Sequence, residues 1–410
     1  MRAGANLPAV GGYNQTVILD AIRRAIDGIS RVEVAAQTGL SAQTVSNVCR
    51  RLLEARLIRE TGTQVAGVGK PRTMMQLEPT GRYAAGIHLD PSLITVVVLD
   101  LSGAVVAHRA IPTLEQQASA ETIANIARAV REVSDAAGVP FDRVMGAGIA
   151  APGPVDVDSG TVLNPPLLAG WENVPVRDAL AEELGMPVLL EKDVTAAAVA
   201  ELWMRTGAER ANMIFFYYGT GVGAGLVVQN EVIRGLTSNA GDVGSVIVGG
   251  GSQGPADRRW RLGNAVIPRL LVSEAIERGL FPDPGVELGT TLVYALFLEL
   301  ARAVHDGEEV AVDILGTVAD DIAVALVPLI NLLDVDLIVF GGPFWTPVSD
   351  FLLERVSARV CASGDLVPPH PIQFITSSIG EDVAAIGAAC LVLDHAFSPR
   401  PAGLLIQRSE

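Results

Sequence analysis

A glycine-dense stretch between two apolar segments constrains the fold of this chain more than any other feature. Residues 215–244 read FFYYGTGVGAGLVVQNEVIRGLTSNAGDVG. Four glycines alternate with small residues after the first apolar segment: Gly219, Gly221, Gly223 and Gly225. Their backbone amides can curl toward an anion, and Thr220 adds a hydroxyl, so one interpretation is a phosphate-binding loop. The alternative is a tight β-hairpin whose glycines only permit positive φ.

Length and composition indicate two or three domains with sizeable cores, since the chain has 410 residues and 49% hydrophobic content. No apolar run reaches the ~20 residues of a membrane span. The N-terminus lacks the charged-then-apolar pattern of a signal peptide, so we expect a cytoplasmic protein.

Cys49, Cys361 and Cys390 lie far apart without a CxxC pair, which argues against a disulfide framework and a cysteine zinc site.

The charge is distributed unevenly along the chain. Its formal net value of −16 ordinarily speaks against binding to nucleic acid. Residues 1–80, however, contain 10 Lys/Arg against 6 Asp/Glu, which leaves 20 against 40 for the remainder. A weakly basic N-terminal part on a strongly acidic body predicts two separate functions in one chain.

The N-terminal part carries start and stop signals of short helices. Residues 1–13 are rich in Gly, Ala and Pro, and we expect them to be flexible. Apolar residues then follow helical spacing over residues 14–28. Ser30 has the position of an N-cap for a second helix over residues 32–38, and Glu33 completes a capping box.

A third helix follows in the spacing of a helix-turn-helix. Ala35, Gly39 and Val45 supply a close helix crossing, a turn and a buried anchor, while Ser41 caps a helix that ends near residue 55. Its outer positions are polar: Ser41, Gln43, Thr44, Ser46, Asn47, Arg50 and Arg51. Such amides, hydroxyls and arginines suit base edges and phosphates. The alternative is a solvated polar face on a small helical bundle.

A β-hairpin is predicted behind these helices, from Leu57 through Gly62 and back over residues 74–77. Its tip carries Lys70 between Gly69 and Pro71, followed by Arg72. A hairpin in this position makes a winged helix, and a basic tip suits a DNA minor groove. An ordinary exposed turn is the alternative for the tip. We therefore predict a DNA-binding domain over residues 14–77.

Residues 78–83 form a short connector, after which the element order βββαβ occurs twice, from residue 84 and again after Asn212. Several motifs then follow in sequence: GAGIAAPGPVD at 146–156, NPPLLAGWENVPV, PVLLEKDVTAAAVAE, GTGVGAGLV, AGDVG and IVFGGP. In these motifs the chain resembles the ROK family, which combines bacterial sugar kinases with sugar-responsive repressors. A winged helix ahead of this body is the form that the family's regulators take.

The resemblance implies an α/β chain with an actin-like, ribonuclease H-like sugar-kinase body and a ligand cleft between its two lobes. The first lobe would span residues 84–200 and receive a returning helix at 383–395. The second lobe would span residues 201–382. Residues 398–410 have the character of a loose tail.

The first phosphate loop of the family's kinases reads Asp-x-Gly-Gly-Thr, and residues 88–92, HLDPS, match it here. His88 takes the place of the aspartate, and Asp90 and Pro91 take the places of the glycines. A carboxylate repels phosphate, and proline removes an amide donor. Two like charges ~4 Å apart cost about 1–4 kcal/mol, depending on the effective dielectric. We therefore expect neither nucleotide binding here nor kinase activity.

The other kinase motifs are partly retained. Asp193 matches the family's catalytic base, which we interpret as a relic, whereas Lys192 replaces a sugar-binding asparagine. In the family's Glu-x-Gly-His sugar motif, the shorter Asp242 replaces the glutamate and Ser245 replaces the histidine. The family's zinc site needs that histidine and a cysteine cluster, but residues 246–264 contain no cysteine and carry Arg258, Arg259, Trp260 and Arg261 instead. No metal and no cofactor are expected.

A ligand-binding function survives these changes. The resemblance places six residues around the cleft: Gly153, Asn164, Lys192, Asp193, Asp242 and Ser245. Lys192 favours an anionic ligand such as a sugar phosphate or sugar acid. Alternatively, Lys192 pairs with the carboxylates of Asp193 and Asp242 and fills an empty pocket.

The sequence thus predicts a cytoplasmic ROK-type transcriptional regulator, and it favours a repressor over an activator. It would bind double-stranded operator DNA as a homodimer or homotetramer, without a membrane partner, and respond to a sugar or sugar derivative. One alternative is an ATP-dependent sugar kinase with a fused DNA-binding domain. A second is a DNA-binding protein that needs no ligand.

Overall fold

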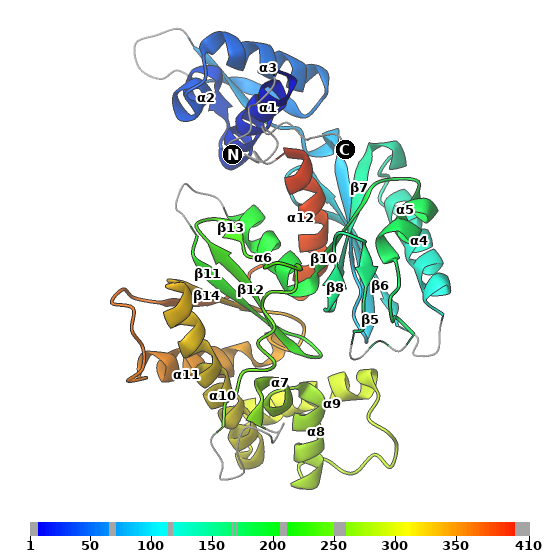
Figure 1. Cartoon of the computed structure of the whole chain (residues 1–410), viewed down its shortest axis with the longest axis vertical. Coiled ribbons are helices and arrows are strands. Elements are labelled where there is room, and N and C mark those ends of the chain that lie inside the picture. The colour runs from blue at the N-terminus through cyan, green and yellow to red at the C-terminus, as the bar shows by residue number, and fades with distance from the viewer. Residues whose placement is uncertain are drawn as a thin grey trace.

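The computed structural model describes residues 7–64, 71–113, 118–165, 168, 170–205, 211–249 and 260–397. A small N-terminal domain (residues 7–77) lies at one end of a larger body (from residue 83), which is built around two β-sheets (Figure 1). Each of these sheets has five strands in the described residues. No helix in this described part is both long and apolar enough to cross a membrane.

The N-terminal domain is a winged helix. Its elements are α1 (Leu7–Arg24), β1 (Ile29–Ser30), α2 (Arg31–Thr38), α3 (Ala42–Glu54), β2 (Ile58–Gln64) and β3 (Arg72–Leu77). The predicted capping box is present, because the Ser30 hydroxyl accepts from the Glu33 amide and the Glu33 carboxylate accepts from the Ser30 amide at 2.9 Å. Gly39 ends α2 at φ 69°, and Ser41 caps α3.

The structure differs from the sequence prediction at the start of this domain. Helix α1 begins at Leu7, inside the segment that we expected to be flexible. Pro8 is compatible with this earlier start, because a first-turn residue needs no intrahelical N–H bond. Residues 1–6, the 398–410 tail and most of the wing tip, Lys70 included, lie outside the described residues.

The first lobe contains the sheet β10-β7-β4-β5-β6. Its strands are β4 (Tyr83–His88), β5 (Leu93–Asp100), β6 (Val105–Pro112), β7 (Val144–Ala151) and β10 (Val188–Lys192). The first three strands pair antiparallel, whereas β7 and β10 join in parallel. Helices α4 (Ser119–Ala136) and α5 (Val176–Leu184) cover one face of this sheet (Figure 1).

The second lobe repeats this arrangement with the sheet β13-β12-β11-β14-β15. Its strands are β11 (Met213–Tyr218), β12 (Val222–Val228), β13 (Glu231–Val232), β14 (Leu337–Gly341) and β15 (Gln373–Thr376). The described residues of this lobe also form the helices α7 (Leu262–Ala265), α8 (Pro268–Glu277), α9 (Thr290–His305), α10 (Glu309–Leu333) and α11 (Ser349–Cys361). The matching strand order confirms the prediction of two similar lobes.

Helices α6 (Asp193–Met204) and α12 (Val383–Phe397) pack against each other between the two sheets (Figure 1). Their contact depends on small residues. A Cβ added at Gly387 of α12 would lie 1.9 Å from the Ala196 carbonyl oxygen of α6. On the other side of α12, a Cβ at Gly148 of β7 would lie 1.9 Å from the Ala388 carbonyl oxygen. The two lobes therefore meet through closely approaching backbones.

The glycine-rich stretch forms the hairpin of β11 and β12 with its turn at residues 219–221. None of its four alternating glycines has positive φ, so the reason that we gave for a hairpin was wrong. Gly223 and Gly225 lie within β12 and face α6: added Cβ atoms would come within 2.5 Å of the Val194 side chain and 2.4 Å of its carbonyl oxygen, respectively. These glycines allow α6 to pack closely on the second sheet.

The N-terminal domain shares its apolar core with the body. Ile18 and Ile22 of α1 belong to the same buried cluster as Ala385 and Ala389 of α12. Arg23 fastens the contact: its guanidinium donates to the Trp203 carbonyl at 2.7 Å and stacks 4.2 Å from the centre of the Trp203 ring. The two parts are thus packed together rather than merely tethered.

Candidate DNA-binding face and effector cavity

The outer face of α3 is polar, as the sequence predicts. Val45, Val48 and Leu52 are buried against the rest of the domain, which turns the opposite side of the helix outward. Six of the seven predicted contact residues are exposed: Ser41, Gln43, Ser46, Asn47, Arg50 and Arg51. Thr44 is partly exposed. This face has the composition of a helix that enters a DNA major groove.

Three side chains of this face are held in one network. The side-chain oxygen Oδ1 of Asn47 accepts from the side-chain amide of Gln43 at 3.2 Å and from the Arg50 guanidinium at 3.4 Å. At the start of the helix, the hydroxyls of Ser41 and Thr44 lie 2.9 Å apart. The hydrogen bonds from Gln43 and Arg50 hold the Asn47 side-chain amide in one orientation.

The wing hairpin adds further positive charge near α2. Arg72 begins β3 opposite Gln64, and its guanidinium lies 3.8 Å from the Glu33 carboxylate. Arg31 pairs with Glu60 of β2 at 3.0 Å. Both pairs are partly exposed, so each stabilises the fold only a little. The other basic residue predicted here, Lys70, is outside the described residues.

A cavity of about 370 Å³ lies between the lobes. Four of the six predicted effector-binding residues line it: Gly153, Lys192, Asp193 and Asp242. Three residues of the predicted phosphate-binding loop line it as well: Thr220, Gly221 and Gly223. Asn164, Ser245 and Gly219 are not part of the lining, and Asn164 and Ser245 are exposed elsewhere. The sugar-side and phosphate-side predictions therefore converge on one cavity.

Lys192 crosses the cavity toward the second lobe. Its ammonium donates to the carbonyl oxygens of Asn239 at 3.4 Å and Ala240 at 3.2 Å. Within the described part of the chain, it makes no ion pair with Asp193 or Asp242. A Cβ added at Gly153 would lie 3.0 Å from Lys192 Cε, so Gly153 leaves room for this side chain. The alternative of a cavity filled by an ion pair does not describe this geometry.

Asn239, which the sequence analysis missed, closes the cavity rim. Its side chain accepts from the Val155 amide at 2.8 Å and donates to the Val155 carbonyl at 2.7 Å. Nearby, Arg234 donates to the buried Glu191 carboxylate at 2.6 Å. Burial raises the pKa of Glu191, and the Arg234 charge opposes that shift. These contacts join residues 234–240 of the second lobe to the first lobe.

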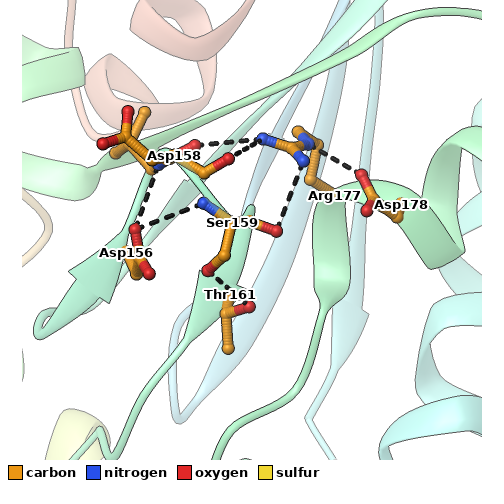
Figure 2. A network of polar contacts seen from close by, with 7 residues as sticks. Asp156, Asp158, Ser159, Thr161, Arg177 and Asp178 are labelled. Carbon is orange, nitrogen blue, oxygen red and sulfur yellow. Dashed lines mark hydrogen bonds and ion pairs between the residues drawn. The ribbon is translucent and has the colours of Figure 1, made fainter.

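The rim of the first lobe is held by a polar network around Arg177 (Figure 2). Its guanidinium donates to the carbonyls of Val157 and Asp158, both at 3.0 Å, and to that of Ser159 at 3.3 Å. The Asp156 carboxylate accepts from the amides of Asp158 and Ser159. Its pKa is lowered mainly by the Ser159 side chain and then by these backbone hydrogen bonds. The network stiffens the hairpin of β8 (Val155–Asp156) and β9 (Thr161–Val162) beside Gly153.

Asp193 begins α6 at the cavity wall, and its carboxylate accepts from the Val194 amide at 2.7 Å. Burial raises the pKa of this carboxyl; His88 and Lys192 oppose the rise, and Asp90 adds to it. A buried carboxyl with a raised pKa at a cavity wall has an environment that is typical of a general base.

Residues 88–92 and the glycine-rich turn, which match the two phosphate loops of the family's kinases, lie next to each other between the lobes. The Asp90 carboxylate accepts from the Ser92 amide at 2.9 Å and lies 3.5 Å from the Thr220 hydroxyl of the second lobe. Asp90 and Pro91 both line the cavity. The Asp90 carboxylate therefore lies at the cavity wall beside the predicted phosphate-binding loop.

Fold and sites together define a two-lobed sugar-kinase-like body joined to a winged helix. The ROK family pattern matches residues 84–259 and 292–395, and a MarR family pattern matches residues 12–67. The chain belongs to the ROK family, with an N-terminal domain of the MarR type.

Individual relatives include both branches of the family. The chain is 22% identical to the xylose repressor of Caldicellulosiruptor bescii, over 90% of this chain and 93% of that protein. It is 27% identical to a glucokinase of Halalkalibacterium halodurans, over 76% of this chain and 95% of the enzyme. A crystal structure of a ROK family transcriptional regulator, a homologue of the E. coli MLC protein, matches at 22% identity with a TM-score of 0.76. That match covers 97% of this chain and 98% of that structure.

Proposed function

We propose that this protein is a cytoplasmic transcriptional regulator, acting as a repressor, that binds operator DNA through α3 and senses a sugar or sugar derivative in the cavity between its lobes. The observation that carries the proposal is the polar, exposed face of α3 in a winged helix fused to a ROK body. It acts as a homodimer or homotetramer on a repeated site, since paired recognition helices read half-sites one helical turn apart.

The decisive experiment is operator selection from genomic DNA, followed by release of the selected fragments with a panel of carbohydrates. A specific sequence that is released by one carbohydrate supports the proposal. Weak, salt-sensitive binding without sequence selection contradicts it. Specific binding that no carbohydrate changes instead identifies a DNA-binding protein that needs no ligand.

The kinase alternative predicts ATP-dependent phosphorylation that Asp193→Asn abolishes. We expect a coupled assay with ATP to remain silent across sugars, because Asp90 repels phosphate and Pro91 donates no amide. A rate that disappears in the Asp193→Asn variant would overturn this expectation. The glucokinase relatives make the assay a necessary control.

Lys192 sets a preference for charge at its end of the cavity. Its ammonium is held by two carbonyl oxygens without a described ion pair, so a ligand carboxylate or phosphate would be its first charged partner. We expect calorimetry to show that D-gluconate or D-glucose 6-phosphate binds more tightly than D-glucose, by about tenfold, and that Lys192→Met removes the difference. Tighter binding of the neutral sugar would contradict this.

Helix α6 provides a route from the cavity to the N-terminal domain. It starts at Asp193 in the cavity wall and ends beside Trp203, which Arg23 of α1 holds by a hydrogen bond and a stacking contact. Ligand-driven closure of the lobes would therefore move α1 together with α6.

This route predicts an uncoupled variant. Arg23→Ala is expected to retain carbohydrate binding and operator binding but to lose most of the carbohydrate-induced change in operator affinity. Fluorescence anisotropy with labelled operator, with and without carbohydrate, measures the effect. Arg302→Ala, which removes an exposed arginine from α9, is the control, and an unaltered response in Arg23→Ala would exclude this route.

A further inference from the structure

Two buried polar atoms lack a hydrogen-bond partner among the described residues: His88 Nε2 and Tyr217 Oη. Their side chains are 5% and 4% exposed, and their rings meet edge to face with centroids 6.2 Å apart. A buried donor or acceptor without a partner costs stability, and such groups are rare in folded proteins. Because both atoms belong to rings that contact each other, they indicate one site rather than two unrelated defects.

The pair adjoins the cavity between the lobes. Tyr217 lines this cavity together with Asp90, Asp193 and Thr220. Burial, reinforced by the negative charges of Asp90 and Asp193, raises the pKa of Tyr217, so its hydroxyl stays protonated and remains a hydrogen-bond donor. Tyr217 thus lies in the cavity wall near the carboxylates of Asp90 and Asp193, whereas Lys192 donates to Asn239 and Ala240. His88 is not part of the lining and is joined to the cavity through its edge-to-face contact with Tyr217.

We propose that Tyr217 and His88, with the carboxylate of Asp90, form a subsite that binds hydroxyl groups of an uncharged part of the effector. A sugar hydroxyl can donate to a carboxylate and accept from the Tyr217 hydroxyl at the same time. A phosphate offers only acceptors and is repelled by Asp90 and Asp193. The proposal rests on the proposed sensing function and assigns the two ends of the cavity: acidic groups toward Lys192, free hydroxyls toward Tyr217.

The adjacent tyrosine offers a matched control. Tyr218 is also buried, but its hydroxyl donates to the Val266 carbonyl in the core of the second lobe. Tyr217→Phe removes a hydroxyl that has no partner in the unliganded protein, so its melting temperature should stay unchanged or rise. Tyr218→Phe removes a satisfied hydrogen bond, so its melting temperature should fall.

The ligand response should show the opposite pattern. The full-length protein and both variants are melted with D-xylose, D-glucose, N-acetyl-D-glucosamine, D-gluconate and D-glucose 6-phosphate, and the strongest stabiliser is titrated by calorimetry. We expect Tyr217→Phe to raise its Kd at least about tenfold and Tyr218→Phe to leave it within about twofold. His88→Leu, which removes the other orphaned atom, should weaken binding in the same direction.

The inference is overturned if Tyr217→Phe and His88→Leu bind the carbohydrate as tightly as the parent protein, which would mean that a trapped water satisfies both groups. It is also overturned if none of the five compounds stabilises the parent protein. Operator binding is measured separately for every variant. Retained operator binding with failed carbohydrate binding rejects the subsite and leaves the DNA-binding function standing.

Discussion

Asn47→Ala is expected to weaken binding to the selected operator by about ten- to a hundredfold, because a base contact made by an amide side chain contributes about 1–3 kcal/mol. Asn47 is exposed on the outer face of α3 and is the shared acceptor for Gln43 and Arg50. Losing it removes a candidate base contact and also releases the two neighbouring side chains. Anisotropy with specific and scrambled DNA measures the effect.

Two further variants make this result interpretable. Arg51→Ala should weaken specific and scrambled DNA alike and lower the salt dependence, as expected of a phosphate contact. Asn331→Ala removes an amide that holds the Asp365 and Val367 backbone in the second lobe and should leave operator affinity unchanged. Equal losses on specific and scrambled DNA for Asn47→Ala would assign it to the phosphate backbone instead.

Gly387→Val is expected to lower the free energy of unfolding by about 3 kcal/mol or more, since overpacking of a closed core typically costs about 1–3 kcal/mol per substitution. The nearest atom to an added Cβ is the Ala196 carbonyl oxygen, at 1.9 Å, so a backbone has to shift. The displaced helices are α6 and α12, which join the lobes. Urea denaturation followed by circular dichroism measures the change.

Gly316→Ala in α10 is the matched control, because an added Cβ there meets nothing within 4 Å. Replacing this helical glycine should raise stability by about 0.5–1 kcal/mol. If Gly387→Val unfolds at the same urea concentration as the parent protein, the close α6–α12 crossing does not describe the molecule in solution.

The N-terminal domain was largely predictable because its signals are local. The capping box of Ser30 and Glu33 and the turn at Gly39 depend on residues three to nine positions apart, and the structure confirms them. The apolar run before the glycine-rich turn likewise predicted a strand, and the structure has β11 over Met213–Tyr218. Local signals do not decide every element: proline disfavours a helix interior, yet α10 continues through Pro328. Packing of α10 in the second lobe outweighs the loss of one backbone hydrogen bond.

The cavity was only partly predictable, because its decisive contacts join distant parts of the chain. Asn239 and Val155 are 84 positions apart, so no local pattern indicates their paired hydrogen bonds. The orphaned Tyr217 hydroxyl has no sequence signature either, because its neighbour Tyr218 has the same chemistry and a satisfied partner. Similarly, the glycines at 223 and 225 suggested an anion loop, whereas in the fold they make room for α6.

The apolar core that continues from α1 into α12 limits how regulators of this kind can be recombined. If the N-terminal domain were exchanged at the connector alone, the α1 of another protein would face Trp203 and α12 of this one. Modularity therefore ends at that surface rather than at the connector. In a biosensor chimaera built from this chain, a new N-terminal domain therefore needs a matching surface at Trp203 and α12, so that the contact between the two parts is kept.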